Sequence, residues 1–297
     1  MHAAAVCITT LLAALPAFAL QRGTLGFALG TKKPDGSCKT TSDYESDFDA
    51  IKINTGSTFV RGYAASECNC AQQILPAAKN KGFKAMLGVW PDVEESFNAD
   101  KEALAIYATK YTDQVYAVTI NDIKAILPKT KVGTADSWNK YADGTADAVI
   151  RGGVDLLMAN AFPYWQGKDV GRGAEFTYFD DIQQALAHIQ QVSGSLDKIE
   201  FWNGETGWPT DGGTNYGEAT AGTNNAAKFY SQGVCSMLRW GINVFYFEAF
   251  DEPWKPASIG DNGEAKDETH WGAMKVDRSK KSNFHLQCRR WRGAEPS

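Results

Sequence analysis

Eight short runs rich in apolar and β-branched residues, separated by stretches with helical spacing, constrain the fold of this chain more than any other feature. The runs are 24–30, 57–64, 83–90, 114–120, 131–136, 154–162, 198–203 and 243–250. They are nearly continuous in apolar residues, which is typical of strands buried on both faces of a parallel sheet. Helical patterns are found between them, at 40–53, 70–81, 98–111, 178–192 and 224–240.

Eight strands alternating with helices over 297 residues predict a (β/α)8 barrel, the TIM-barrel fold, in one domain at 20–288. The alternative is a doubly wound parallel sheet. That fold requires a glycine-rich phosphate-binding turn after its first strand, and no such turn follows Gly30. The sequence also contains no P-loop and no GxSxG motif, so a nucleotide enzyme or a serine hydrolase has no local support.

One spacing between strands is too short for this pattern. Only residues 121–130 separate the fourth run from the fifth. A crossover between parallel strands, with its helix, needs at least about 10–12 residues. We therefore predict a truncated fourth unit, in which the helix is a stub or a segment has been lost.

The two ends of the chain differ from the predicted barrel. Residues 1–20 carry no Lys, Arg, Asp or Glu, and Ala17-Phe18-Ala19 forms a small-x-small cleavage pattern. This predicts a secretory signal peptide at 1–19, with a buried N-terminal helix as the alternative. Residues 289–297 begin with a basic run and are expected to form a solvated tail. With no hydrophobic C-terminal tail for a lipid anchor, we expect a secreted, extracellular protein.

Composition argues against several classes of partner. The chain has 30 basic and 35 acidic residues, a formal charge of −5, which disfavours a nucleic-acid partner. No apolar run reaches the ~20 residues that a membrane-spanning helix needs. Only four His are present, none in an HExxH motif, and Cys68-x-Cys70 is too tight for a usual zinc knuckle. We therefore expect no metal and no cofactor.

Five cysteines remain after the predicted cleavage, and in a secreted protein they favour disulfide bonds. We expect the pairs Cys38–Cys68 and Cys235–Cys288, although the sequence admits other connectivities. The odd count leaves one thiol free or paired between chains. The sequence does not indicate an oligomeric state.

Carboxylates, amides and large aromatic residues gather where the predicted strands end, which is the catalytic rim of a (β/α)8 barrel. Such a mixture suits carbohydrate, because sugar rings stack on aromatic side chains while their hydroxyls bond to acids and amides. Trp138, Trp208 and Trp254 lie beside polar rim residues and are candidate sugar platforms, with burial in the core as the alternative. Glycosidic cleavage commonly uses two carboxylates. Glu205, just past a predicted strand in a glycine-flanked turn, is the best catalytic candidate, and a structural ion pair is its alternative.

Six segments of the sequence resemble glycoside hydrolase family 17, in particular its fungal secreted branch of cell-wall β-1,3-glucan hydrolases and glucanosyltransferases. They are 59–69 (FVRGYAASECN), 82–92 (GFKAMLGVWPD), 131–138 (KVGTADSW), 158–167 (MANAFPYWQG), 203–210 (NGETGWPT) and 245–255 (FYFEAFDEPWK). The resemblance runs from about residue 23 to Cys288, and the last two segments are highly specific together.

This resemblance implies a (β/α)8 fold and action on β-1,3-glucan with retention of configuration. It implies that Glu205, in the GETGWP segment, is the nucleophile. It also implies substrate-contacting roles for Tyr63, Asp136, Asn160, Tyr164, Glu248, Glu252 and Lys255.

The chain departs from the family after the fourth strand. There the family has a Gly-Ser-Glu or Gly-Asn-Glu turn, whose Glu is the acid/base, followed by a fuller helix. Here residues 116–119 (YAVT) pass directly into 120–127 (INDIKAIL), so that Glu and about twenty family residues are missing. Asp122 is the nearest carboxylate, and we expect it to open the stub helix rather than to donate a proton. An error in the gene model that skipped part of the coding sequence would leave the same gap.

Two classes of function follow. One is a secreted β-1,3-glucan hydrolase or glucanosyltransferase, impaired by the missing acid/base segment. The other is a catalytically inactive cell-wall protein that binds glucan through its aromatic cleft. An unrelated barrel enzyme would require a cofactor site that the sequence does not contain. Hydrolysis and transfer are not distinguished by the sequence, because they depend on which acceptor reaches the glycosyl-enzyme.

Overall fold

The structure, a computed structural model, describes residues 22–288 except 91–92, 119–123, 126, 196, 213–214, 257 and 260–264. The predicted signal peptide, the basic tail at 289–297 and Asp122 lie outside the described residues. Within them, no helix is long and apolar enough to cross a bilayer. The same residues contain no cluster of three or more His, Cys, Asp or Glu side chains arranged to hold a metal ion.

Eight parallel strands form a closed barrel in chain order, and the last strand pairs with the first. They are β1 (Leu25–Ala28), β2 (Phe59–Gly62), β3 (Lys84–Leu87), β4 (Val115–Val118), β5 (Lys131–Ser137), β6 (Leu156–Asn160), β7 (Glu200–Thr206) and β8 (Asn243–Tyr246). Each falls largely within one of the eight predicted runs, so the predicted TIM barrel is confirmed. After β8 the chain forms a small antiparallel pair of strands, β9 (Ser258–Ile259) and β10 (Ala265–Lys266).

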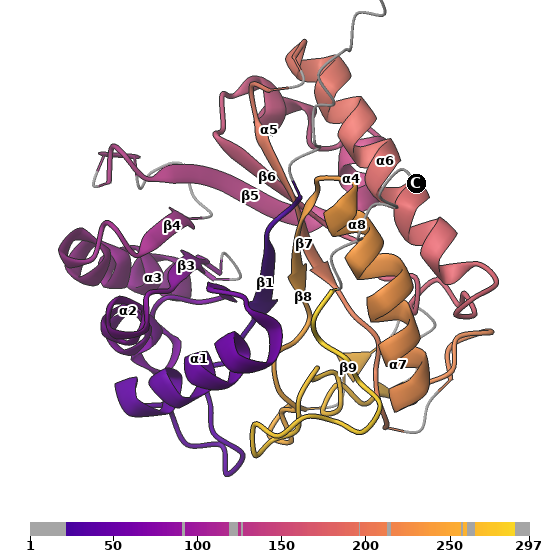
Figure 1. The fold of residues 1–297 in the computed structure, drawn as a ribbon. Coiled ribbons are helices and arrows are strands. Elements are labelled where there is room, and N and C mark those ends of the chain that lie inside the picture. The colour runs from indigo at the N-terminus through magenta and orange to yellow at the C-terminus, as the bar shows by residue number, and fades with distance from the viewer. Residues whose placement is uncertain are drawn as a thin grey trace, which may run out of the picture.

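Helices cover the outside of the barrel, with α1, α2 and α3 on one side of the strands and α6, α7 and α8 on the other (Figure 1). The helices are α1 (Thr41–Thr55), α2 (Cys70–Lys81), α3 (Glu94–Tyr107), α4 (Trp138–Ala142), α5 (Asp147–Arg151), α6 (Ala174–Ser193), α7 (Thr223–Phe229) and α8 (Cys235–Arg239), with 3-10 turns η1 (Glu67–Asn69) and η2 (Ala108–Lys110) and a π-helical turn η4 (Tyr230–Val234). The stretch predicted as one helix at 224–240 is therefore α7, η4 and α8 in series. The short helices α4 and α5 were not predicted.

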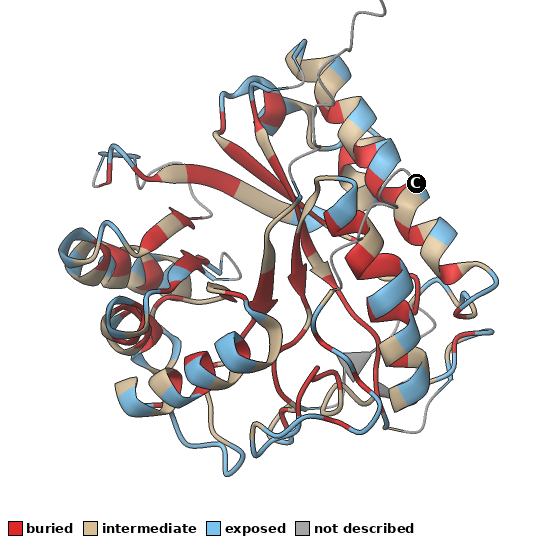
Figure 2. Ribbon diagram, in the orientation of Figure 1, coloured by how far each residue is buried: buried red, intermediate tan, exposed pale blue. Residues whose placement is uncertain are grey.

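Two apolar layers hold these elements together. The inner layer fills the barrel and contains Met86, Ala117, Met158, Trp202 and Phe245, with Trp202 stacked on Phe245 at 4.7 Å between ring centres. The outer layer lies between strands and helices. Figure 2 shows the buried residues along the strands and on one face of the longer helices. Strands buried on both sides explain why their runs are nearly continuous in apolar residues.

The fourth unit is truncated, as the spacing predicts. Residues 119–130 join β4 to β5, and none of the described residues among them belongs to an α-helix. Leu127 anchors this connection, since its side chain is buried in the outer apolar layer. The β4–β5 pairing consists of two residue pairs, Ala117 with Lys131 and Val118 with Val132. The barrel thus closes across β4 with few paired residues.

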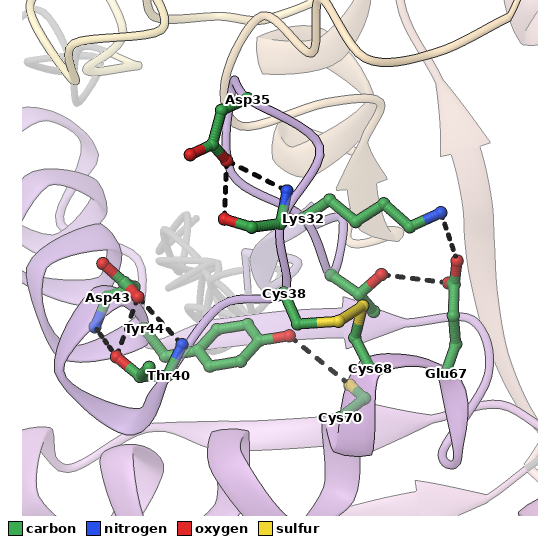
Figure 3. The surroundings of a disulfide bond; sticks show 11 residues. Lys32, Asp35, Cys38, Thr40, Asp43, Tyr44, Glu67, Cys68 and Cys70 are labelled. Carbon is green, nitrogen blue, oxygen red and sulfur yellow. Dashed lines mark hydrogen bonds and ion pairs between the residues drawn. A yellow bond between two sulfur atoms is a disulfide. The ribbon is translucent and has the colours of Figure 1, made fainter.

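Two disulfides fasten loops to the barrel, and both predicted pairs are confirmed. Cys38–Cys68 joins the segments that follow β1 and β2, and Cys235–Cys288 ties the C-terminal segment to α8. Among the described residues Cys70 is the free cysteine, and it is buried beside the first disulfide, where the Tyr44 hydroxyl donates to its sulfur at 3.8 Å (Figure 3). Burial raises the pKa of the Cys70 thiol to about 12, so it is protonated and unreactive at neutral pH.

Asp181 makes the stability of the fold depend on pH. It lies on α6, is buried, and accepts a 2.6 Å hydrogen bond from Gln166 in the segment after β6. Burial raises the pKa of Asp181 to about 6, and the bond from Gln166 opposes this only in part. The fold therefore binds this proton more tightly than the unfolded chain does. Its contribution to stability is present below pH 3.8 and is lost as the pH rises through 6.

We expect Asp181→Asn to stabilise the protein at pH 8 by about 3 kcal/mol, because one pKa unit corresponds to about 1.4 kcal/mol and the amide keeps an acceptor for Gln166. At pH 3.5 the gain should vanish. Urea denaturation of both proteins at the two pH values measures it. An equal gain at both values would contradict the assigned cause.

Candidate active site

A cleft of about 780 Å³ opens at the carboxyl ends of the strands. Its described walls come from the ends of every strand except β4, since residues 119–123 lie outside the description. Both polar and aromatic side chains line it. The polar residues include Arg61, Tyr63, Glu67, Asp100, Asp136, Asn160, Glu205, Glu248, Glu252, Lys255 and Glu268, and the aromatic ones include Trp90, Phe162, Trp165, Phe247, Trp254 and Trp271.

Glu205 is the penultimate residue of β7, not a turn residue as the sequence suggests, because β7 continues through Thr206. Its carboxylate meets the Arg61 guanidinium at 3.0 Å, and both side chains are largely buried, 15% and 8% exposed. Gly204 is needed for this packing. A Cβ there would lie 2.6 Å from Asn160 Oδ1 and 3.1 Å from Arg61 Nη1. The glycine thus makes room for neighbouring side chains of the site.

Arg61 is held in place by two further contacts. Its Nη1 donates a 2.7 Å hydrogen bond to the carbonyl of Gly204, next to Glu205 in the chain. Its guanidinium also lies 4.9 Å from the centre of the Tyr63 ring. A buried cation fixed from several sides supplies a steady positive charge at the Glu205 carboxylate.

Burial raises the pKa of Glu205 above its ordinary value of 4.5, while Arg61, Tyr63 and Lys255 act against this rise. Glu268, which also lines the cleft, raises it further. The cations therefore favour the ionised form in an environment that would otherwise neutralise the carboxyl. An ionised carboxylate with restricted hydration is suited to act as a nucleophile.

A second charged group lies beside Glu205 after β8. Lys255 Nζ contacts both oxygens of Glu248 at 2.7 Å and one oxygen of Glu252 at 3.2 Å. The other Glu252 oxygen accepts from the Gly30 amide at 3.0 Å. Burial and the nearby Glu252 raise the pKa of Glu248 well above its ordinary value, and Lys255 opposes them. Lys255, Glu248 and Glu252 thus form a compact polar wall. Its geometry depends on Lys255, which contacts both carboxylates.

Three buried polar atoms of the cleft have no hydrogen-bond partner among the described residues. They are Asn160 Oδ1 and the indole nitrogens of Trp254 and Trp271. Buried polar groups are usually satisfied, so such a set around one cleft is typical of groups that bond to a polyhydroxylated ligand. Trp165 stacks on Trp271 at 5.4 Å between ring centres and extends the apolar wall.

Most of the predicted site residues meet at this cleft. Tyr63, Asp136, Asn160, Glu205, Glu248, Glu252 and Lys255 all line it, and so does Trp254.

Trp138, Tyr164 and Trp208 are not among the residues that line the cleft. Trp208 is fully buried, donates its indole N–H to the Thr220 carbonyl at 2.9 Å, and packs on the outer apolar layer. Tyr164 is buried against Trp208. Trp138 begins α4 and packs partly buried against the same layer. Trp138 has polar sequence neighbours, whereas Tyr164 and Trp208 do not. All three rings pack in the outer apolar layer instead of lining the cleft.

Sequence reasoning missed several residues of the site. Arg61 is a buried charge at the end of a strand, which is a signal that could have identified it. Trp165 and Trp271 occupy the aromatic wall. Glu268 follows residues 260–264, which lie outside the described residues, and its sequence carries no distinguishing pattern.

The described cleft holds no carboxylate at the end of β4. The sequence contains no Glu between Glu102 and Glu175, a span that includes β4, β5 and β6. Glu67 and Asp100 are committed elsewhere, because Glu67 pairs with Lys32 and Asp100 accepts from backbone amides. The described residues therefore provide an aromatic cleft with one carboxylate, Glu205, paired with a buried arginine, and none of them places a carboxylate at the end of β4.

Comparison with known proteins places these features in one family. The profile of Glycosyl hydrolases family 17 matches residues 123–288, and that of the BtgE/BtgC glycoside hydrolase domain matches 26–122. The boundary between the two matches falls in the connection between β4 and β5.

Two curated relatives are each named "Glucan 1,3-beta-glucosidase". The protein of Arthroderma benhamiae is 52% identical, with 94% of this chain and 95% of the relative covered. That of Saccharomyces cerevisiae is 41% identical, with 90% and 91% covered. The alignment with the Arthroderma relative is 297 positions long, but it includes only 94% of the residues of this chain, or about 279 residues. About 18 of its positions thus have no residue of this chain.

A solved structure shares the fold. The family 17 β-1,3-glucanosyltransferase of Rhizomucor miehei superposes with a TM-score of 0.75 at 26% identity, covering 89% of this chain and 98% of that one. An active-site mutant of the same enzyme in complex with laminaritriose superposes with a TM-score of 0.74 at 25% identity, with the same coverage.

Proposed function

The chain belongs to glycoside hydrolase family 17, and we propose that it acts on β-1,3-glucan through a glycosyl-enzyme intermediate on Glu205, with slow turnover of natural glucan. The observation that carries this proposal is the Glu205–Arg61 pair in a cleft without a described carboxylate at the end of β4. The names of the relatives and the laminaritriose complex of the structural neighbour support the substrate class.

In the first step the Glu205 carboxylate attacks the anomeric carbon, and the bond from that carbon to the leaving oxygen breaks. Arg61 holds the attacking carboxylate ionised and oriented. In the second step water or a sugar hydroxyl attacks the same carbon and gives up its proton to solvent, while the bond to Glu205 breaks and the carboxylate is released. Two inversions give net retention.

The first step on natural glucan expels a sugar alkoxide, which must be protonated as it leaves. A general acid contributes typically 10²–10⁴-fold to such a step. About 18 positions of the Arthroderma relative have no counterpart here, and the family profiles meet at 122–123. The first fact supports a deletion in this chain, and the short connection between β4 and β5, residues 119–130, supports its place after β4. The proposed defect is thus specific to leaving groups that need a proton.

We further propose that the protein is secreted and meets β-1,3-glucan in a fungal cell wall. The predicted signal peptide at 1–19 and the two disulfides support export through an oxidising compartment.

The test compares two substrates of the same enzyme. With 2,4-dinitrophenyl β-laminaribioside, whose leaving group departs as a stable anion, we expect release of the phenolate and a mass increase of the protein by one laminaribiosyl unit. With laminarihexaose we expect turnover at least about 10²-fold below that of a family member with the complete segment. Equal turnover of laminarihexaose would contradict the proposed defect.

The second candidate is a glucan-binding protein without catalysis, which the missing β4 carboxylate favours. It predicts binding of laminarihexaose but no phenolate release and no covalent adduct. Where the adduct forms, shorter products from laminarihexaose indicate hydrolysis and longer products indicate transfer.

A further inference from the structure

Trp90 is a large aromatic side chain exposed at the mouth of the cleft. It lies on the loop after β3, lines the same cleft as Glu205, and is 53% exposed. Most large aromatic residues of the described chain are buried. An exposed indole beside a functional cleft is typical of a binding surface.

The backbone of Trp90 is held at both ends by α3. Its amide donates to Asp100 Oδ2 at 2.8 Å, and its carbonyl accepts from the Ser96 hydroxyl at 3.2 Å. The indole therefore extends from a fixed point of the loop.

Asp100 joins this loop to the neighbouring one. Its other oxygen accepts from the Ser66 amide at 2.7 Å and from the Ser66 hydroxyl at 2.6 Å, in the segment after β2. Asp100 is fully buried. A buried carboxylate is costly unless hydrogen bonds satisfy it, so these bonds strongly favour a single arrangement of the two loops. Ser66, Ser96 and Asp100 all line the cleft below Trp90.

Trp90 and Glu205 stand on opposite sides of the barrel. In the closed order, three strands separate β3 from β7 in either direction. Eight strands about 4.8 Å apart with a tilt of about 36° form a barrel about 15 Å across. This is wider than one sugar ring. The Glu205 side chain reaches across this width to Arg61 of β2, but it is only 15% exposed, whereas Trp90 is 53% exposed. A ring stacked on the indole therefore lies farther out in the cleft than the ring bonded to Glu205 and is a different unit.

We propose that Trp90 is a sugar-stacking platform for a glucosyl unit of β-1,3-glucan remote from the cleaved bond, with Asp100 as its positioning residue. This inference rests on the proposed function. The occupant is the glucan chain itself, because the cleft that holds Glu205 continues without interruption to the indole. The platform adds affinity for long chains and none for short ones that end before reaching it.

The test measures binding of laminari-oligosaccharides by calorimetry in a Glu205→Gln background, which prevents turnover. We expect Trp90→Ala to weaken laminarihexaose about 10-fold, the scale of a lost aromatic stacking contact, and laminaribiose less than 2-fold. Trp90→Tyr should recover most of the loss. Trp240→Ala is the matched control, since Trp240 is 37% exposed and stacks on Phe179 away from the cleft.

An unchanged laminarihexaose affinity in Trp90→Ala overturns the platform, and so does an equal loss for both ligands. A loss of the same size in Trp240→Ala also overturns it. If the Glu205→Gln protein with Trp90 unchanged binds no laminari-oligosaccharide at all, the proposed function itself fails. The two failures are thus distinguishable.

Discussion

Glu205→Gln is expected to reduce the release of dinitrophenolate from 2,4-dinitrophenyl β-laminaribioside by about 10⁴-fold or more, the scale of a lost nucleophile. The amide still fits beside Arg61 but cannot form the glycosyl ester. Stopped-flow absorbance measures the rate, and intact-protein mass spectrometry measures the adduct. The adduct should be absent from the variant.

The matched control is Glu218→Gln, which changes an exposed Glu in the segment after β7. It should release phenolate at the parent rate. A Glu205→Gln protein that retains a tenth of the parent rate, or still gains the laminaribiosyl mass, would show that another group attacks the anomeric carbon. Thermal unfolding of both variants separates a chemical loss from misfolding.

The pH profile of the same reaction follows from the environment of Glu205. Attack requires the ionised carboxylate, and burial raises its pKa above 4.5. The rate with the activated substrate should therefore fall as the pH drops, with a midpoint above 4.5. No alkaline limb from a general acid is expected, since phenolate departure needs no proton.

The strands could be predicted from the sequence because each is buried on two faces and appears as a nearly continuous apolar run. The truncated fourth unit was visible from spacing alone. Glu205 was identified because strand ends converge in a closed barrel. In each case the information lies within one segment of the chain.

Contacts between distant segments could not be predicted in the same way. Arg61 and Glu205 are 144 positions apart, and nothing local to either residue names its partner. Trp208 comes shortly after the polar residues Glu205 and Thr206, yet the turn at Gly207 packs closely against Phe247, where a Cβ would lie 2.0 Å from the carbonyl oxygen. That turn places the Trp208 ring in the outer apolar layer. Such turns decide whether a tryptophan at the rim faces the cleft or the core. The composition of the segment does not reveal this orientation.

Lys255→Met is expected to destabilise the protein by about 3–5 kcal/mol at pH 7, the cost of removing one partner from a buried ion pair. Without the cation, Glu248 and Glu252 remain buried together, and Glu248 is 2% exposed. The methionine replaces most of the aliphatic length of lysine, so the loss is electrostatic rather than a cavity. Urea denaturation of both proteins measures it.

The pH dependence of this loss identifies its cause. Burial and Glu252 already raise the pKa of Glu248, and loss of Lys255 removes the group that opposes them. The folded variant therefore binds protons more tightly than the unfolded chain, and its stability falls as the pH rises from about 4 toward 7. The difference from the parent should be smaller at pH 4 than at pH 7. Lys255→Met combined with Glu248→Gln should recover part of the loss at pH 7, because one buried charge is removed together with its partner. A loss that is independent of pH and unaffected by the second change would mean that Lys255 stabilises the cleft by packing rather than by its charge.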